Sequence, residues 1–433
     1  MSLNTLTPEQ QEACDKFLGF LLSEEKEFYL FGAAGCGKTF LTQHFISELV
    51  DKYKNTAKML GLPITDYVIA VTATTNKAVE VLNQGKVFNG DLYIETIYKL
   101  LGIVVKEDYS TGKTYLTDTN KQLVIYDSII FIDECSMLPT QMLNYIRKKT
   151  KNCKIIFIGD SYQLAPVNEK PHWNSTPENV TVSLKTPVRN QNKTSLISLC
   201  SQLRKNVDDN TAITINTVPG EIEHLTQVEV SNWLNNFDPE KQKVLCYTNH
   251  TAVKYNEFIS KCKGFTKPHY EGNIYINNSM TIPNWSKTVR YYPEEQIKIN
   301  KLNKYEIIFF GDISFGGYSA QISSVNNPKK RSNVYICYNY NQVKRALKQC
   351  ADKNNWTTYF NIQNQVMDLR LPYASTIHKA QGNTYDEVLI DLDSFKSCTD
   401  PDVAARLLYV AVSRAKNKVL FYGSLPKKFG EVV

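Results

Sequence analysis

Short apolar runs flanked by polar residues recur along most of the chain, and each has the length of a strand. The clearest are residues 27–31, 67–72, 124–132, 154–158, 244–248, 387–392 and 418–422. After several of them, apolar residues return every three or four positions, as in the helix that Phe40, Leu41 and Phe45 predict. Buried strands that alternate with helices are typical of α/β folds with parallel sheets, so we predict that fold class.

Two stretches depart from this alternation. Residues 103–117 hold two short strand patterns around a turn at 110–113, which predicts a β-hairpin. Because it interrupts the strand–helix order, we expect it to protrude from the sheet, either as a structural arm or as a functional wedge. Residues 264–370 hold short β patterns separated by Gly, Asn and Pro, with one helical segment near 342–353. They predict a small, β-rich, barrel-like domain.

The first residues predict a helix rather than a leader segment. Thr7 is a suitable cap and Pro8 suits the first helical position. Glu9, Glu12 and Asp15 lie where a signal peptide would have its apolar core. No window approaches the roughly 20 apolar residues of a membrane span. We therefore expect a cytoplasmic protein without membrane contact, in the host cytoplasm if a phage encodes it.

Composition narrows the classes of ligand. The ten cysteines form no C-x-x-C pair and no Cys/His spacing typical of zinc, so neither a zinc site nor a disulfide framework is predicted. Lys and Arg number 50 against 43 Asp and Glu, a formal net charge of +7. Such a modest excess permits a polyanionic partner without requiring one.

The stretch from Gly32 to Thr39 carries the most specific chemical pattern. It fits G-x-x-x-x-G-K-[ST] at every required position, after a strand and before a helix. Its glycines let backbone N–H groups turn toward phosphate oxygens, and the helix start adds a favourable dipole. Lys38 would reach the β- and γ-phosphates, and the Thr39 hydroxyl would hold Mg²⁺. The predicted nucleotide-binding residues are Gly32, Ala33, Ala34, Gly35, Cys36, Gly37, Lys38 and Thr39.

Two later strand ends add polar side chains suited to phosphate chemistry. The strand at 124–132 is followed by Asp133 and Glu134, at the edge where α/β sheets bind ligands. Asp133 is placed to hold Mg²⁺, and Glu134 to orient or deprotonate the attacking water. Gln163, after the strand at 154–158, is a candidate for sensing the γ-phosphate or orienting water.

Small polar residues lie at several strand-to-helix turns. Thr72, Thr74 and Asn76 lie around the end of the strand at 67–72, and Thr96 begins a comparable turn. Such residues suit contacts to phosphates through side chains and helix N–H groups. They are also ordinary helix caps, so the pattern alone leaves both interpretations open.

Taken in order, these segments resemble a superfamily 1 DNA helicase of the 5′→3′, RecD-like branch, and phage helicases of that branch are the most similar in size and layout. The resemblance spans nearly the whole chain. It rests on residues 32–39, 131–134, 159–163, 376–382 and 409–415. It departs from the family pattern at 71–74, where a proline is usual.

The resemblance implies two RecA-like P-loop domains with ATP bound in the cleft between them. It divides the chain into RecA-like domain 1A (1–102 and 118–190), a β-hairpin pin (103–117), RecA-like domain 2A (191–263 and 371–433) and an SH3-like domain with a helical insertion (264–370).

The resemblance also implies roles for single residues. Gln10 would read the adenine, and Gln163, Arg189 and Arg414 would surround the γ-phosphate. An arginine that reaches the transferred phosphoryl group can be worth about 10³–10⁵ in rate. The implied catalytic residues are thus Lys38, Glu134, Gln163, Arg189 and Arg414. The residues that match single-strand contacts are Thr72, Thr74, Asn76, Thr96, Thr376, His378 and Lys379.

We therefore expect an ATP- and Mg²⁺-dependent helicase that moves 5′→3′ along single-stranded DNA and separates the duplex ahead, in replication, repair or recombination. Its expected partners are single-stranded DNA, single–double-strand junctions and a single-stranded-DNA-binding protein, and we expect it to act as a monomer. One alternative is a translocase that displaces proteins or remodels junctions without net unwinding. Another is a P-loop kinase or nucleotide-regulated binding module, which would not explain the segments at 381–382 and 413–414.

Overall fold

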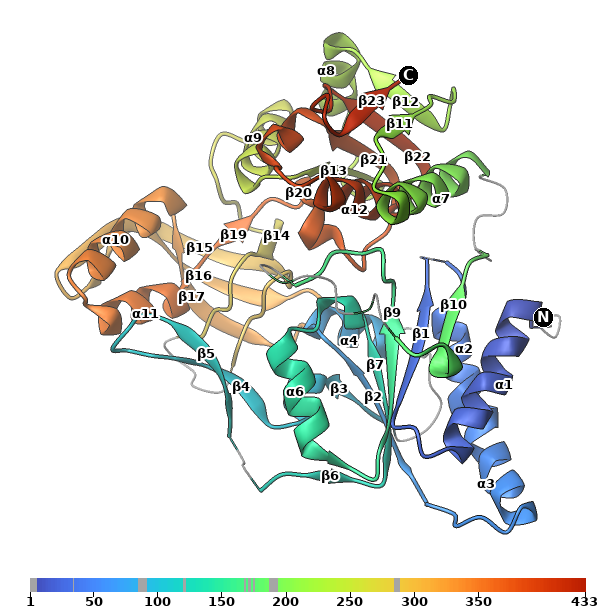
Figure 1. Cartoon of the computed structure of the whole chain (residues 1–433). Coiled ribbons are helices and arrows are strands. Elements are labelled where there is room, and N and C mark those ends of the chain that lie inside the picture. Colours follow the sequence, from blue (N-terminus) through green and yellow to red (C-terminus); the bar gives the residue numbers. More distant parts are fainter. Residues whose placement is uncertain are drawn as a thin grey trace. The chain divides into compact units, whose positions relative to one another are not determined.

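The computed structural model describes residues 6–33, 35–84, 92–119, 122–166, 169, 173, 176–186, 194–283 and 289–433 (Figure 1). The chain forms two compact units. The first comprises Met1–Val104, Asp118–His224 and Ala380–Val433, and the second comprises Val105–Thr117 and Leu225–Lys379.

The first unit is built on a six-stranded sheet in the order β10-β1-β9-β7-β2-β3, in which every pairing is parallel. Its strands are β1 (Glu27–Gly32), β2 (Val68–Ala73), β3 (Tyr93–Thr96), β7 (Ser128–Asp133), β9 (Lys154–Gly159) and β10 (Thr181–Leu184). The central strands are buried along most of their length. Strands covered on both faces require continuous apolar runs, which is why these elements were visible in the sequence.

The predicted strand at 124–132 is interrupted in the structure. Asp127 adopts a left-handed backbone with φ of +48° and separates β6 (Ile125–Tyr126) from β7. The short strand β6 pairs with β8 (Thr150–Lys151) outside the main sheet. Asp127 is one of the two polar residues in the run, and Asp tolerates the left-handed conformation better than most residues.

Helices connect the strands of this sheet. They are α1 (Pro8–Leu22), α2 (Lys38–His44), the π-helix η1 (Phe45–Leu49), α3 (Val50–Met59), α4 (Asn76–Gln84), α5 (Ile97–Leu100) and α6 (Thr140–Lys149), with short 3₁₀ turns at Cys135–Met137 and Glu178–Val180. The capping prediction for α1 is confirmed, because Thr7 and Gln10 form a reciprocal capping box and Pro8 opens the helix. At its far end, the buried Lys154 ammonium donates to the carbonyls of Phe20, Ser23 and Glu25 at 3.0, 2.6 and 2.7 Å.

The C-terminal part of the first unit is a further α/β layer. Its elements are α7 (Thr194–Asp209), β11 (Ile213–Ile215), β12 (Ile222–Leu225, which ends at the unit boundary), β21 (Tyr385–Asp391), the 3₁₀ turn Asp393–Ser397, α12 (Pro401–Val412), β22 (Ala415–Tyr422) and β23 (Gly430–Val432). β21 and β22 pair in parallel. Helix α12 is buried from Ala404 to Val412 and packs against α7, because its apolar residues cover all sides.

The second unit contains a six-stranded, largely antiparallel sheet in the order β18-β17-β16-β15-β14-β19. Its strands are β14 (Ile274–Asn277), β15 (Gln296–Phe310), β16 (Ile313–Ser324), β17 (Arg331–Cys337), β18 (Val366–Met367) and β19 (Leu369–Arg370). Two of the short β patterns in 264–370, at 297–299 and 307–310, belong to the single strand β15. The register shifts between Ile299 and Lys301 and again between Leu302 and Tyr305, so the apolar alternation is broken midway.

Two helices, not the single predicted one, join β17 to β18. They are α10 (Tyr340–Asp352) and α11 (Trp356–Gln365). Helix α11 begins Trp-Thr-Thr-Tyr-Phe, residues that favour strands intrinsically. Its asparagine cap, Asn355, accepts from the Thr358 N–H at 3.2 Å and starts the helix nevertheless.

The rest of the second unit comprises α8 (Gln227–Asn235), β13 (Gln242–Cys246), α9 (Asn249–Cys262), β20 (Ala374–Thr376) and the 3₁₀ turn Ile377–Ala380, whose last residue is across the unit boundary. β13 and β20 pair in parallel. The buried Asn256 amide joins α9 to β20, donating to the Ala374 carbonyl and accepting from the Tyr373 and Ala374 N–H groups.

The predicted hairpin forms from β4 (Ile103–Glu107) and β5 (Thr114–Asp118). Its outer part lies against one face of α11. Tyr109 packs edge-on against Phe360 at 5.0 Å between ring centroids, and Asn364 donates to Glu107 at 2.8 Å. A Cβ atom on Gly112, whose φ is +69°, would meet the Trp356 ring at 2.2 Å. Hairpin and helix are therefore closely fitted.

Among the described helices, none is both long and apolar enough to cross a bilayer.

Candidate functional site

The glycine-rich loop lies between β1 and α2 in the first unit, as its sequence predicts. Gly35 and Gly37 have φ of +83° and +86°, which glycine adopts without steric cost. The Lys38 ammonium donates to the carbonyls of Gly32 and Ala33 at 2.7 and 3.0 Å. Cys36 and Ala33 are both buried, while Ala34 is outside the described residues. The loop thus has the backbone shape that phosphate binding requires.

Two carboxylates lie at the end of β7. The Asp133 carboxylate accepts the N–H of Glu134 at 2.8 Å. Glu134 has a left-handed backbone with φ of +52°, a conformation that costs a non-glycine residue energy and tends to occur at functional sites. Burial raises the pKa of both carboxyls, that of Glu134 to about 6, and Lys38 and Arg414 counteract the rise at Glu134. Glu134 is therefore poised to accept a proton.

The predicted Mg²⁺ ligands satisfy the chemical requirements for that ion. Thr39 and Asp133 line one small cavity, together with Thr42. Mg²⁺ prefers carboxylate and other oxygen ligands and usually keeps several of its waters. A bound cation would also supply the opposite charge that the buried Asp133 carboxyl needs, because burial alone disfavours its ionised form.

Gln163 and Arg414 are both buried in the first unit, with exposed fractions of 5% and 4%. Gln163 accepts from the amide of Gln381 at 3.4 Å. The Arg414 guanidinium donates to the Val410 and Asn383 carbonyls at 3.1 and 3.2 Å. Its charge opposes the rise that burial causes in the pKa of Glu134, so Arg414 lies within electrostatic reach of that carboxylate. Residues more than 200 positions apart thus meet beside the loop.

Sequence reasoning missed the residues that hold these segments together. The Tyr409 hydroxyl donates to Asp160, which is 1% exposed. Arg406 donates to the Ser161 carbonyl at 2.7 Å and pairs with Asp402 at 2.9 Å. Asp160 and Tyr409 both lie inside segments on which the family resemblance rests, 159–163 and 409–415. Their polar side chains within those segments are the one signal in the sequence that could have identified this contact. These contacts tie α12 to the loop after β9.

A cavity of about 120 Å³ lies beside the glycine-rich loop. Its lining includes Ala33 and Gly35 from the loop, Cys200 and Arg204 from α7, and Tyr409 from α12. The Arg204 guanidinium lies 4.3 Å from the centroid of the Tyr162 ring, within the range of a cation–π contact. Arg204 therefore adds a positive charge to the cavity beside the loop, and the sequence alone did not identify it as a candidate site residue.

Two further predicted ATP contacts have different outcomes. Gln10 is 4% exposed, and its amide oxygen accepts the Thr7 N–H at 3.0 Å. Its amide nitrogen would lie only 2.7 Å from a Cβ atom on Gly37, so Gln10 adjoins the loop. Arg189 lies outside the described residues, and its role stays a prediction.

The predicted DNA contacts of the first unit differ in accessibility. Thr72 is fully buried, and its hydroxyl donates to the Phe131 carbonyl at 2.9 Å inside the sheet. Thr74 is partly exposed and its hydroxyl lies 3.5 Å from the Glu134 carbonyl. Asn76 is exposed at the start of α4. Thr96 caps α5 by accepting from Lys99 at 3.2 Å. Asn76 is therefore the most accessible of the four, and Thr74 and Thr96 are both partly exposed.

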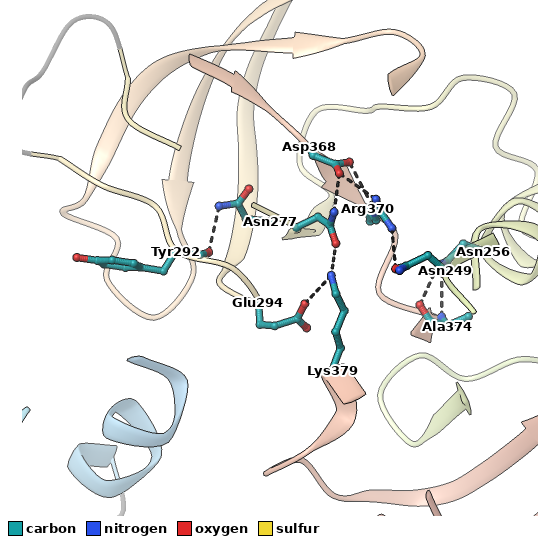
Figure 2. Close-up of polar contacts among 10 residues, drawn as sticks. Asn249, Asn256, Asn277, Tyr292, Glu294, Asp368, Arg370, Ala374 and Lys379 are labelled. Atoms are coloured by element: carbon teal, nitrogen blue, oxygen red, sulfur yellow. Dashed lines mark hydrogen bonds and ion pairs between the residues drawn. The ribbon is translucent and has the colours of Figure 1, made fainter. Parts of the chain in front are cut away.

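The predicted DNA contacts of the second unit lie around one polar network, shown in Figure 2. The Lys379 ammonium pairs with Glu294 at 3.2 Å and donates to Asn278. Asn278 in turn donates to Asp368 at 2.6 Å. Asp368 pairs with Arg370 at 3.0 Å. Lys379 is thus already engaged by an acidic and an amide side chain.

Thr376 and His378 are the other two predicted DNA contacts of the second unit. Thr376 is 5% exposed at the end of β20 and lines the same cavity as Lys379. The His378 ring lies 6.3 Å from that of Tyr247, and burial lowers its pKa. Burial therefore favours the neutral form of the His378 ring.

Comparison with known proteins gives two domain matches. Residues 18–169 match the AAA domain family, and residues 371–422 match the UvrD-like helicase C-terminal domain. A protein of Acanthamoeba polyphaga mimivirus, R530, is 23% identical over 95% of this chain and 99% of its own length. The ATP-dependent DNA helicase Pif1 of Campylobacter jejuni is 24% identical over 90% of this chain and 86% of that protein.

Among solved structures, the Pif1 helicase from Bacteroides in complex with ADP-AlF3 and single-stranded DNA matches with a TM-score of 0.51. The sequences are 15% identical, and the match covers 98% of this chain and 94% of that one. The likeness establishes the fold. The predicted α/β class with RecA-like P-loop architecture is confirmed.

Proposed function

We propose that this chain is a superfamily 1 helicase of the Pif1/RecD-like branch, an ATP hydrolase that translocates 5′→3′ on single-stranded DNA and separates the duplex ahead. The observation that carries the proposal is the polar cluster of the first unit. There Lys38, Glu134, Gln163 and Arg414 gather from segments far apart in the chain. A protein that only binds a nucleotide does not require Gln163 and Arg414 beside the glycine-rich loop.

The chemistry follows from these groups. Lys38 would exchange its two loop carbonyls for phosphate oxygens, and Thr39 with Asp133 would hold Mg²⁺, which neutralises charge on the phosphates. Burial gives Glu134 a raised pKa, to about 6, so its carboxylate is a competent proton acceptor near neutral pH. Arg414 would stabilise the charge that develops on the transferred phosphoryl group. Arg189 is proposed to share that role, and Gln10 to read the adenine.

The DNA side of the proposal rests on Thr74, Asn76, Thr96 and the residues around Lys379. Polar groups that grip a backbone without reading bases suit a motor that must pass over any sequence. Further expectations belong to the proposal: the domain boundaries implied by the resemblance, a layout most like phage members of the branch, monomeric action, and a single-stranded-DNA-binding protein as partner. The Pif1 relatives support the DNA substrate through their own named activity.

The decisive experiment measures ATP hydrolysis with and without single-stranded DNA. We expect strong stimulation by DNA, because binding should complete a site that a motor keeps incomplete until it holds its track. Lys38→Ala and Glu134→Gln should both abolish turnover, while Glu134→Gln should still bind ATP. An absence of stimulation would remove the motor interpretation, and turnover retained in Glu134→Gln would remove its role as proton acceptor.

Tailed duplexes then separate the remaining alternatives. A 5′ single-stranded tail should support unwinding and a 3′ tail should not. Unwinding only with a 3′ tail would contradict the assigned branch. DNA-stimulated hydrolysis without strand separation on either substrate would favour the translocase that displaces proteins or remodels junctions.

A further inference from the structure

The net positive charge of the chain is concentrated in one segment. Residues 264–370, which form the β-rich sheet and its two helices, contain 14 Lys and Arg against seven Asp and Glu. Their net charge is thus +7, equal to that of the whole chain, and the rest of the chain is balanced. A basic module on a neutral frame is the electrostatic pattern expected of a nucleic-acid-binding surface.

The second unit has an open groove of about 410 Å³ beside this module. It lies among α9, the loop that follows it, the β17–α10 junction and β19. Lys261, Lys267 and Lys344 line it, and all three are exposed. Tyr338, also in the lining, has an exposed fraction of 44%. We call these four residues and the space between them the lysine–tyrosine groove.

The charges of the groove are unbalanced. Arg370 and Asp368 also line it, but they form an ion pair at 3.0 Å and cancel each other. Glu257 is the remaining acidic residue of the lining. No ion pair within the described part of the chain engages the three lysines. Three lysines therefore face one carboxylate, which favours an anionic occupant.

Aromatic rings and a fixed loop accompany the lysines. Tyr338 contacts Tyr305, itself 54% exposed, with ring centroids 5.9 Å apart. The loop that carries Lys267 is held by Tyr270, whose hydroxyl accepts the N–H groups of Thr266 and Lys267 at 2.7 and 2.8 Å. The groove is preorganised on this side, so little ordering is required on binding.

We propose that the lysine–tyrosine groove binds single-stranded DNA, with lysines on the phosphates and Tyr338 stacked on a base. Exposed aromatic faces beside backbone-binding cations distinguish single strands from duplex, whose bases are already stacked. The proposal rests on the proposed function for the nature of its ligand. None of Thr376, His378 and Lys379 lines the groove. The groove shares Arg370 and Leu371 with the cavity that Thr376 and Lys379 line, so it is an adjacent site that would extend the predicted motor track.

The test compares the full chain with a triple variant, Lys261→Ala/Lys267→Ala/Lys344→Ala. The control is Lys26→Ala/Lys52→Ala/Lys58→Ala, which removes the same charge from exposed positions of the first unit. Binding of labelled oligothymidylate of about eight and about 30 nucleotides is measured by fluorescence anisotropy over a range of salt. Each phosphate contact contributes roughly 0.7 to the slope of log K against log salt for a single strand. With the long strand, loss of the three lysine contacts should therefore reduce the magnitude of that slope by about 2.

The tyrosine is tested separately. Tyr338→Ala should weaken binding of the long strand about fivefold or more, whereas Tyr338→Phe should retain it, since stacking needs only the ring. With the short strand, both groove variants should match the unaltered chain in affinity and in stimulated ATP hydrolysis. Equal melting temperatures establish that the exposed substitutions leave the fold intact.

Several results would overturn the proposal. A groove variant indistinguishable from the surface control would remove the site. Equal loss with the short strand would place the lysines on the motor track, and a loss confined to duplex DNA would exclude the single strand as ligand. Failure of the proposed function is recognised independently, because no oligonucleotide would then stimulate ATP hydrolysis in the unaltered chain.

Discussion

Two glutamates with strained backbones each lie beside a lysine of a predicted site. Glu134 and Glu294 have φ of +52° and +66°, values that L side chains avoid at a cost of order 1 kcal/mol or more. Glu134 lies within electrostatic reach of Lys38, and Glu294 pairs with Lys379. In both cases a glutamate at a strained turn interacts with a cation that is expected to hold phosphate, through an ion pair at Glu294 and through electrostatic influence at Glu134.

The contact between Glu294 and Lys379 predicts competition with DNA. Glu294→Gln keeps the side chain's shape and removes the charge that a phosphate must displace. We expect single-stranded DNA to bind about two- to fivefold more tightly, in line with a partly exposed ion pair worth up to about 1 kcal/mol, when affinity is measured by anisotropy at low salt.

The neighbouring Glu295→Gln provides the matched control, because Glu295 pairs with Lys330 at 2.8 Å instead. Both substitutions remove one negative charge from adjacent positions. Equal tightening by the two variants would mean that net charge, and not release of Lys379, is responsible.

For single residues, the sequence predicts those whose place depends on a neighbouring strand or turn, and it misses contacts between residues far apart in the chain. Lys38, Asp133 and Glu134 were identified because each follows a buried strand at a fixed spacing. Thr72 was proposed as a DNA contact, yet its hydroxyl is bonded inside the sheet, and only the tertiary fold decides that direction. The pair of Asp160 and Tyr409 spans 249 positions, and spacing along the chain carries no information about it.

Among the elements, the hairpin of β4 and β5 carries the most direct functional prediction. Deletion of Ser110–Lys113 should impair separation of a tailed duplex while sparing DNA-stimulated ATP hydrolysis, since the tip contributes no residue to the nucleotide cluster. Strand displacement and hydrolysis are measured on the same preparation. The exposed substitution Lys113→Ala serves as a control for local charge.

The support of the hairpin can be tested without altering it. Trp356→Ala removes the ring that closely approaches Gly112 and should lower unwinding in the same direction as the deletion. If unwinding and hydrolysis fall together in the deletion variant, the hairpin is a structural arm and its wedge role is rejected.

The predicted elements were most accurate where one pattern ran without interruption. The buried strands of the parallel sheet and the hairpin were found because their apolar and turn residues agree with their local structure. Helix α11 was missed because Trp356, Thr357 and Thr358 favour strands, and packing of Phe360 and Ile362 into the core decides otherwise.

For the molecule as a whole, the two compact units differ from the predicted domains. The segments predicted to form RecA-like domain 2A, 191–263 and 371–433, are divided between the units at residues 224–225 and 379–380. The hairpin is grouped with the β-rich module. Sequence patterns reveal which elements form, but the grouping depends on contacts such as that of Tyr109 with Phe360, which link distant segments.

Acid stability of the second unit should depend on His269. The ring is 6% exposed, and burial lowers its pKa from the usual 6.5 to about 4, with the Leu369 backbone and Asp368 opposing the shift. The imidazole of His269 binds a proton more readily in the unfolded chain than in the folded one. Its contribution to the free energy of unfolding is therefore complete above about pH 6.5 and is lost as pH falls toward 4. The shift corresponds to about 3 kcal/mol.

Urea unfolding at several pH values tests this expectation. His269→Phe should lose less stability between pH 7 and pH 4.5 than the unaltered chain does, because the buried group no longer titrates. The exposed His250→Gln should behave as the unaltered chain. Parallel pH profiles for all three proteins would show that acid sensitivity arises elsewhere.

The concentration of charge in residues 264–370 affects how the chain approaches a nucleic acid. Since the remaining residues carry no net charge, long-range attraction acts almost wholly on the β-rich module and would turn a diffusing chain so that this module arrives first. At about 0.1 M salt the attraction reaches only about 10 Å. Added salt would then slow capture more than it speeds release, and a strand already held at the proposed DNA contacts would be comparatively insensitive to it.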